Sequence, residues 1–470
     1  MPLKVYHTKT GRKEEITYAP HRSQLLLYTC GPTVYHFAHI GNFRAYVFED
    51  FFRRTLAFFG FAVKHVMNLT DIDDKTIKRA SEKGMTLGTF TQFYKNAFFE
   101  DLEALEILPA HHYPSASEYI PQMIHMIKTL LDKGLAYQVE EGSIYFSIDR
   151  FPSYGTLSHL PVGDLKVGGS NRVTSDEYEK QCAADFVLWK RYDPGRDGAI
   201  FWESPFGKGR PGWHIECSAM ARALLGKTID IHIGGVDNIF PHHENEIAQS
   251  EGCHDQLFTR FWVHVDHLVV DGKKMSKSLN NFYTLRDVLA KGYSSAEIRY
   301  LLMSTHYRIK LNFTIDGLHA ARHSLDRLGN FVDRLHQVQG GHCYHSRVQT
   351  ARAQFRQALG DDLNISKALA VLFNFVRRVN LDIDRGFMTV LGAAEILTFL
   401  GDVNDVLGFI PMKGGQCKWP KEVQIALDKR QEARHKKNWA EADRHRDYIE
   451  SKGYKIEDDP RGPRLRKIKS

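Results

Sequence analysis

Three patterns follow one another closely between residues 25 and 69. Leu25–Cys30 (LLLYTC) is a short apolar run of the kind that forms a buried strand. From Ala45 to Phe59, large apolar residues recur at intervals of three and four, which predicts a helix, and Gly60 stands where a C-cap belongs. Phe61–Leu69 (FAVKHVMNL) indicates a second strand. A strand, a helix and a strand with short connections predict a parallel α/β unit.

The same pattern returns far along the chain. Ile229–Ile233 predicts a strand, Gly-Gly follows it, and a helix is expected through His243–Gln249 before another apolar run at Phe261–Val270. From Pro121 to Phe206 the pattern loosens and turn clusters such as DPGRDG appear. The chain is therefore expected to form a nucleotide-type fold that is split in two by an inserted domain.

The chain after about Asp316 has a helical pattern. Two apolar stripes predict a helical bundle. They are Leu325, Leu328, Phe331 and Leu335 in one helix, and Leu369, Leu372, Phe373 and Val376 in another. One long charged helix is expected at about Lys421–Lys452, followed by a DDPRGPR turn and a basic end.

The charge of the chain is uneven. The formal net charge is +7, and residues 421–470 hold 15 Lys and Arg against 10 Asp and Glu. On its own this surplus favours a solvated charged helix, with a domain that faces nucleic acid as the alternative.

The first residues have no apolar core that would indicate a signal peptide, and no run of about 18 apolar residues could span a membrane. Six scattered cysteines without a CxxC pair do not suggest a disulfide framework. A cytoplasmic protein is expected.

Two motifs carry recognisable chemistry. Pro32–Asn42 (PTVYHFAHIGN) lies between a strand end and a helix, where parallel sheets bind ligands and free backbone amides suit phosphate. Lys274–Ser278 (KMSKS) places two lysines three residues apart on a small loop, where they could offset charge on a departing pyrophosphate. Alone, the histidine of the first motif is more often a core or surface residue, and the second motif could be a solvated loop.

In this order, the two motifs resemble those of class I aminoacyl-tRNA synthetases, which carry HIGH near the N-terminus and KMSKS after the second half of a split Rossmann fold. The resemblance implies that His39, Asn42, Lys274 and Lys277 bind ATP and assist catalysis. Asn42 stands where the motif has histidine. Asparagine can donate a hydrogen bond but carries no positive charge, so the role of Asn42 stays open.

Further segments resemble the cysteinyl-tRNA synthetases within this class. They are LYTCGPTVY around Cys30, NLTDIDDK from Asn68, RPGWHIECSAM from Arg210 and FPHHENEIAQSE from Phe240. The resemblance covers nearly the whole chain, most strongly residues 25–80 and 205–310. HIGG at His232 and Asn280 after KMSKSL depart from the usual family pattern.

The resemblance implies one zinc ion per chain. In that family the metal is held by the cysteine of the CGxTVY segment, the cysteine of WHIECS and two residues of HHENE, which here are Cys30, Cys217, His242 and Glu246. His242 and Glu246 are four residues apart, so a helix presents both on one face, and all four side chains are ordinary zinc ligands. Grouping the two cysteines rests on the resemblance alone. Substrate cysteine would add as a fifth ligand or displace Glu246, and both remain open.

The resemblance also implies residues around the substrates. Gly31, Thr70 and Trp213 match positions around the cysteine substrate, with a packing role as the alternative for Trp213. Asp237 follows a Gly-Gly turn and is suited to accept hydrogen bonds from the ATP ribose. The family reads the anticodon with its C-terminal domain, which in this chain suggests Arg434, Trp439 and Asp443 as tRNA contacts. An exposed tryptophan could equally anchor the helix.

The fold class expected is α/β: a split Rossmann-type parallel sheet with an inserted domain, then a helical bundle and a small C-terminal anticodon-binding domain. The boundaries expected are 1–120 and 207–258 for the two catalytic halves, 121–206 for the insertion, 259–318 for a KMSKS-bearing linker domain, 319–405 for the bundle and 406–470 for the C-terminal domain.

The reaction implied is ligation of L-cysteine to tRNA(Cys) through a cysteinyl-adenylate, with Mg²⁺ accompanying ATP. The oligomeric state stays open, with a monomer as the expectation. A ligase that delivers the same adenylate to a small amine is the nearest alternative, but such relatives lack the long C-terminal extension. A zinc hydrolase would leave KMSKS unexplained, and a pure RNA-binding protein would leave the N-terminal half unexplained.

Overall fold

The computed structural model describes residues 2–160, 185–276, 279, 281–341, 346–412, 421–459 and 462–467. The chain forms two compact units, Met1–Met412 and Lys413–Ser470, which are described separately below. None of the described helices is long and apolar enough to cross a membrane.

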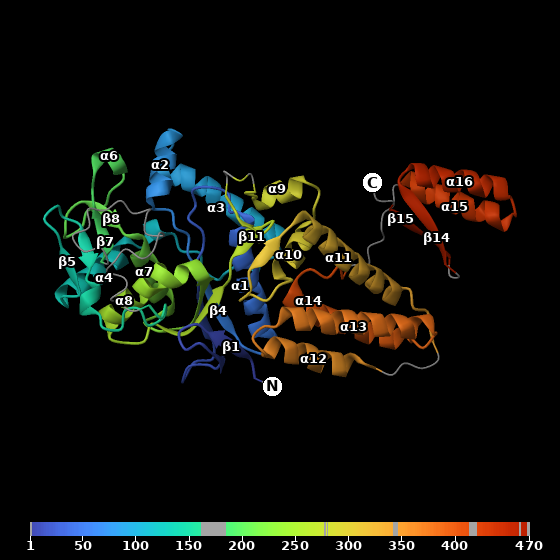
Figure 1. Cartoon of the computed structure of the whole chain (residues 1–470), viewed down its shortest axis with the longest axis horizontal. Coiled ribbons are helices and arrows are strands. Elements are labelled where there is room, and N and C mark those ends of the chain that lie inside the picture. Colours follow the sequence, from blue (N-terminus) through green and yellow to red (C-terminus); the bar gives the residue numbers. More distant parts are fainter. Residues whose placement is uncertain are drawn as a thin grey trace. The chain divides into compact units, whose positions relative to one another are not determined.

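The first unit contains a four-stranded parallel sheet in the order β10-β9-β3-β4. Its strands are β3 (Leu25–Thr29), β4 (Val63–Met67), β9 (Ile229–Gly235) and β10 (Thr259–Val265). The helix α1 (Ile40–Phe58) connects β3 to β4. Figure 1 labels strand β4 of this sheet and the helix α1 that contacts it. The split parallel sheet is therefore confirmed. Because β3 pairs with β4 on one side and with β9 on the other, the strand order reverses beside β3, where α/β sheets bind ligands.

The helix α1 begins at Ile40, five residues before the predicted start. Its apolar face is buried, including Phe48, Phe51, Phe52 and Leu56. The early start follows from a capping box at His39, which the apolar periodicity alone does not reveal.

The insertion between the catalytic halves has its own sheet, which is antiparallel in the order β5-β6-β7-β8. The strands are β5 (Ala136–Gln138), β6 (Ile144–Phe146), β7 (Phe186–Arg191) and β8 (Gly209–Pro211). The helices α4 (Ile120–Asp132) and α6 (Pro194–Asp197) belong to the same part. Buried side chains of α4 and this sheet share a hydrophobic cluster with α7 (Trp213–Leu225), the helix that leads back into the catalytic fold.

The predicted apolar run Phe261–Val270 is divided between two sheets. Its first part is β10 and its second is β11 (Leu268–Val270), which pairs with β12 (Lys273–Lys274) and β13 (Leu311–Phe313). Two helices lie between the last two strands, α9 (Leu285–Ala290) and α10 (Ser295–Met303). This small sheet carries the start of the KMSKS motif.

A helical bundle completes the first unit. It consists of α11 (Ile315–His336), α12 (Val348–Gly360), α13 (Ile365–Asp384) and α14 (Val390–Leu407). The first predicted stripe is buried in full. In the second, Leu369, Leu372 and Val376 are buried, whereas Phe373 is only partly buried and carries the Arg327 guanidinium over its ring. Phe375, which was not predicted, is buried instead. The bundle and the catalytic sheet share one continuous hydrophobic core.

The second unit differs from the single long helix predicted for the tail. Two helices, α15 (Lys421–His435) and α16 (Trp439–Ser451), pack against each other. Beside the predicted turn, β14 (Tyr454–Asp459) and β15 (Gly462–Lys467) pair as antiparallel strands. Residues 460–461 of that turn and 468–470 of the basic end lie outside the described residues. The second unit has its own small hydrophobic core, which consists of Val423, Ala426, Leu427 and Ile449.

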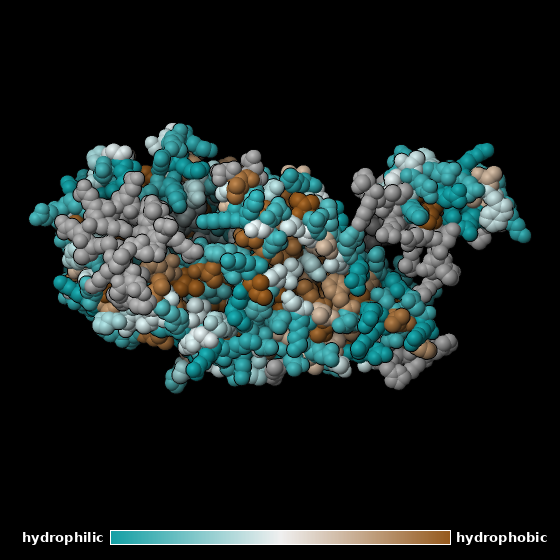
Figure 2. All heavy atoms as spheres, in the orientation of Figure 1, coloured by the Kyte–Doolittle hydropathy of each residue, from teal (hydrophilic) through white to brown (hydrophobic). Residues whose placement is uncertain are grey.

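Five further strands and helices belong to the first unit. They are β1 (Lys4–His7), β2 (Arg12–Glu15), α2 (Asp74–Glu82), α3 (Leu87–Ala104) and α8 (Glu244–His254). The face drawn in Figure 2 is largely hydrophilic, with hydrophobic patches among the polar residues of the catalytic part.

Candidate functional site

The predicted zinc ligands lie at the carboxyl edge of the central sheet. Cys30 directly follows β3, and His242 and Glu246 follow β9, the strand that pairs with β3. Because the carboxyl ends of neighbouring parallel strands meet at one edge, residues more than 200 positions apart come together here. α7 brings Cys217 to the same edge, within hydrogen-bond reach of Cys30.

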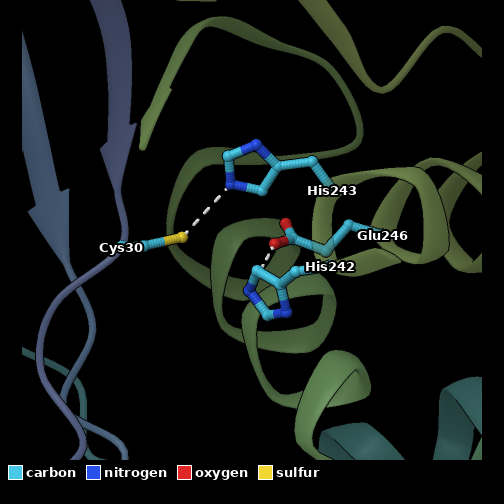
Figure 3. Close-up of side chains that lie close together, drawn as sticks. All are labelled: Cys30, His242, His243 and Glu246. Carbon is cyan, nitrogen blue, oxygen red and sulfur yellow. Dashed lines mark hydrogen bonds and ion pairs between the residues drawn. The ribbon is translucent and has the colours of Figure 1, made fainter. Parts of the chain in front are cut away.

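Four possible metal ligands converge at this edge: Cys30, His242, His243 and Glu246 (Figure 3). Each offers one ligand atom, and these atoms all lie within 4.8 Å of one another. Cys30 Sγ lies 3.4 Å from His243 Nε2, and His242 Nε2 lies 2.9 Å from Glu246 Oε1. His243 is an addition to the predicted set.

Cys217, the fourth predicted ligand, is not one of these four residues, but it packs in one hydrophobic cluster with Cys30. Its side chain is buried and shares hydrogen bonds with Cys30 and His242. The hydrogen bond with Cys30 lowers the pKa of Cys217 to about 6 against the opposing effect of burial, and the same hydrogen bond raises the pKa of Cys30. One thiol of the pair is therefore readily ionised, and a thiolate is the form that binds metals.

A second layer of histidines contacts the first. Each of three outer imidazoles lies 2.8–2.9 Å from one inner side chain, and the pairs are His232 with Glu246, His214 with His242 and His264 with His243. Outer partners of this kind orient metal ligands and fix their protonation. These three outer histidines were not predicted as site residues. His243 of the inner group was also missed, although its position next to His242 was an available signal.

The donor set fits a zinc ion. Burial alone raises the pKa of Glu246, but His232 and His242 outweigh burial and bring this pKa down to about 2. Burial also opposes protonation of His242, yet Glu246 and Cys217 raise its pKa to about 10. A protonated His242 thus supplies positive charge beside the buried carboxylate, and a cation bound by sulfur, imidazole and carboxylate would supply that charge in its place.

The HIGN motif forms the start of α1. The His39 backbone N–H donates to Asn42 Oδ1, and the Asn42 backbone N–H donates to His39 Nδ1, each over 3.1 Å. Because Nδ1 accepts a hydrogen bond, a neutral His39 carries its proton on Nε2. Burial lowers the pKa of His39 to about 4, so the imidazole is neutral near pH 7 and can donate from Nε2. Asn42 therefore has a capping role that needs no positive charge.

The KMSKS segment approaches this helix start. A Cβ atom added to Gly41 would lie 3.3 Å from the Met275 side chain, so the two motifs are neighbours. Lys274 is exposed at the end of β12, and Lys277 lies outside the described residues. Asn281 accepts a hydrogen bond from the Ser276 backbone N–H and donates one to the Lys274 carbonyl. The sequence did not predict that Asn281 holds the backbone of this segment through two hydrogen bonds.

The predicted pocket residues surround the same edge. Gly31 packs so closely on the strand end after β4 that an added Cβ would lie 1.8 Å from the Asn68 carbonyl oxygen. Thr70 is buried and accepts a hydrogen bond from the Asn68 side chain. Trp213 is 41% exposed and stacks on His242, with 4.3 Å between the ring centroids. Asp237 stands after β9 with 61% of its side chain exposed.

The predicted tRNA contacts belong to the second unit. Arg434 lies near the end of α15, whereas Trp439 and Asp443 lie one turn apart at the start of α16, so the three do not share one helix. Trp439 is 59% exposed, and Asp443 forms an ion pair of 3.0 Å with Arg446.

Comparison with protein families gives two matches. A model described as the catalytic domain of class I tRNA synthetases (C) matches residues 17–323, and a DALR domain model matches residues 354–411, which cover most of α12, α13 and α14.

Comparison with individual proteins gives relatives over the full length. The cysteine–tRNA ligase of Protochlamydia amoebophila is 53% identical over 470 residues, covering 99% of this chain and 98% of that protein. The cysteine–tRNA ligase of Chlamydia muridarum is 53% identical over 481 residues, covering 100% of both. Among solved structures, methionyl-tRNA synthetase of Mycobacterium tuberculosis with methionyl-adenylate superposes with a TM-score of 0.63 at 14% identity, covering 82% of this chain and 92% of that one.

Proposed function

This chain belongs to the class I cysteine–tRNA ligases and charges tRNA with cysteine, and we propose that it does so through a cysteinyl-adenylate selected by a zinc ion. The observation that carries the proposal is the group of Cys30, His242, His243 and Glu246 at the carboxyl edge of the sheet, with buried Cys217 packed beside Cys30. It lies beside Trp213, and the helix start at His39 follows β3 and Cys30 along the chain.

The proposed reaction has two steps. The carboxylate of L-cysteine attacks the α-phosphate of ATP, which forms cysteinyl-adenylate and releases pyrophosphate. The 2′-hydroxyl of the 3′-terminal adenosine of tRNA(Cys) then attacks the activated carbonyl and releases AMP. No side chain serves as a nucleophile, because positioning and stabilisation of charge can supply the rate enhancement.

The phosphates of ATP are the proposed ligands of the two signature motifs. His39 Nε2 donates a hydrogen bond as a neutral imidazole, and the free amides at the start of α1 add to it. Lys274 and Lys277 offset the charge that develops on pyrophosphate, together with Mg²⁺ bound to ATP. Asn42 supports His39 by capping the helix, and exposed Asp237 is assigned to the ribose.

One zinc ion per chain is the proposed selector of the amino acid. Cys30, Cys217 and His242 would hold it, with Glu246 as the ligand that stays or yields when substrate binds. The ion would bind the substrate thiolate, a softer ligand than any serine oxygen. Trp213 stacks on His242. Gly31 after β3 and Thr70 after β4 are proposed to border the substrate cysteine.

The second unit is proposed to contact the tRNA anticodon through Arg434, Trp439 and Asp443. Exposed Trp439 offers a surface on which a base can stack, and arginine can recognise a guanine edge. A monomer in the cytoplasm, where ATP and tRNA are available, completes the proposal.

ATP–pyrophosphate exchange measured with each amino acid in turn tests this function. Exchange should depend on cysteine and fall when zinc is removed by a chelator. Exchange with cysteine that is fully retained in the zinc-free protein would contradict the proposed role of the metal. Transfer of cysteine from the adenylate to a small amine instead of tRNA would favour the alternative ligase, although the match to a DALR domain and the additional C-terminal unit argue against it.

A further inference from the structure

A row of aromatic rings leads from the HIGN motif to the surface. Neighbouring rings have centroids 5.4–6.1 Å apart and pack edge to face. In order, the row consists of His39, Phe282, His36, Phe37 and Phe93. The loop before α1, the segment before α9, and α3 each contribute to it, so elements from distant parts of the sequence build one surface.

The outer end of this row is open to solvent. Phe93 on α3 is 54% exposed, and Phe37 is only partly buried against it. Single exposed apolar residues are ordinary on protein surfaces. Here, however, two phenylalanines form a continuous patch that begins at a residue of the ATP site.

Positive side chains border the patch. The Arg286 guanidinium of α9 lies 5.0 Å from the Phe37 ring centroid, while also pairing with Glu100 and Asp101 of α3. Two residues before Phe37 in the sequence, Tyr35 has the Lys75 ammonium 5.7 Å and the Arg79 guanidinium 5.1 Å from its ring centroid.

Lys75 and Arg79 have no ion pair with any carboxylate in the described part of the chain. Their charges are therefore available to an anionic ligand. We call Tyr35, Phe37 and Phe93, with the cations Lys75, Arg79 and Arg286, the aromatic ledge.

We propose that the aromatic ledge binds the unpaired 3′ end of the tRNA, with bases stacked on the rings and phosphates near the cations. This inference rests on the proposed function, which requires that end of the tRNA to enter the site. Exposed rings interleaved with cations are the features by which proteins bind single-stranded nucleic acid. A paired stem would offer backbone but no free base faces, so the ledge favours the unpaired nucleotides.

The test compares complete tRNA(Cys) with the same transcript lacking its unpaired 3′ nucleotides. Wild-type protein should bind the complete transcript more tightly. Phe93→Ala should weaken binding of the complete transcript by about 5- to 100-fold, the range for loss of one stacked base, and leave binding of the shortened one unchanged. Phe93→Tyr should retain the wild-type affinity, because the ring is kept. Lys75→Ala should weaken binding of the complete transcript, and that binding should depend less on salt concentration than in wild type.

Phe387→Ala is the matched control, since this phenylalanine is 45% exposed but lies in the bundle, after α13. Phe387→Ala should leave the difference in affinity between the complete and the shortened transcript unchanged. Equal binding of the complete transcript by wild type and Phe93→Ala would overturn the proposal, as would an equal loss for both transcripts. Cysteine-dependent ATP–pyrophosphate exchange distinguishes failure of the proposed function from failure of the ledge proposal. Wild-type protein without exchange contradicts the proposed function. Normal exchange together with unaltered tRNA binding in Phe93→Ala contradicts only the proposal for the aromatic ledge.

Discussion

His39 and Asn42 show how one pair of side chains serves both the helix and the site. The sequence motif indicated an ATP-binding role for both residues, but it did not show that each caps the backbone of the other. The cap turns His39 Nδ1 into an acceptor and leaves Nε2–H free to donate. Asn42 of HIGN therefore fixes the orientation of His39 in this chain.

The low pKa of His39 predicts a specific dependence of stability on pH. The pKa is about 4 in the folded chain and about 6.5 in an unfolded one. Unfolded protein therefore takes up the proton first, so stability is fully present above pH 6.5 and is lost as pH falls from 6.5 toward 4. The variant His39→Asn keeps a good N-cap residue but has no side chain that takes up a proton in this pH range.

The free energy of unfolding of both proteins, measured by denaturant titration between pH 7 and 4, checks this expectation. Wild type should lose more stability than His39→Asn over this range, by up to about 1.4 kcal/mol for each pH unit. Parallel curves for the two proteins would show that His39 titrates near its ordinary pKa.

The metal site could be predicted from the sequence only in part. The spacing of His242 and Glu246 predicted that they share a helix face, whereas joining Cys30 to Cys217 required a family resemblance. His243 escaped prediction because neighbouring residues in a regular helix point in different directions. In the structure both histidines precede α8, in a π-helical turn with extended backbone at Phe240, where regular spacing does not apply.

At the scale of elements, the tail shows where periodicity fails. The predicted single helix is interrupted at Lys437, which has a φ of 55°, and Asn438 caps the next helix by accepting from the Glu441 backbone N–H. A stretch of lysines without glycine or proline gives little signal for such a break. Asn438 itself was the available signal, since asparagine is a preferred N-cap.

The KMSKS segment should act mainly on the transition state. Lys277→Ala is expected to lower the rate of cysteine activation by about 10- to 1,000-fold, as for loss of one preorganised electrostatic contact, with little change in the KM for cysteine. Asn281→Ala should reproduce part of this loss, because it removes the brace between Ser276 and Lys274.

Steady-state ATP–pyrophosphate exchange at varied cysteine and ATP concentrations measures both effects. A raised KM for cysteine with an unchanged kcat in Lys277→Ala would instead place the segment at the amino-acid pocket.

At the scale of the whole molecule, the sequence indicated the α/β class but not the strand order. Local patterns predict each strand and α1, because apolar spacing is a local property. They cannot pair β3 with β9, because that contact spans about 200 residues and depends on packing of the whole sheet. This pairing brings Cys30 beside His242 and Glu246, so local patterns alone could not place these three residues together.

The two compact units predict that activation and tRNA charging can be separated. A chain that ends at Met412 retains the catalytic sheet, the bundle and their shared core. Cysteine-dependent exchange should remain within about twofold of wild type, whereas aminoacylation should fall at least about tenfold and lose much of its salt sensitivity. Trp439→Ala in the full chain should reproduce part of the loss. Equal charging of tRNA by the full chain and the shortened one would show that the second unit does not read the anticodon.

The central claim is that a zinc ion held by Cys30, Cys217 and His242 chooses cysteine over serine. Apolar pockets separate small groups by only about 10- to 200-fold, whereas a soft metal can bind a thiolate directly. The most direct measurement is metal content by mass spectrometry together with the ratio of kcat/KM for cysteine and serine, in wild type and Cys217→Ser. We predict one zinc per chain, a ratio of about 10⁴ or more, and near loss of cysteine activation together with zinc in Cys217→Ser. A protein that contains no zinc and still strongly prefers cysteine over serine would contradict this account.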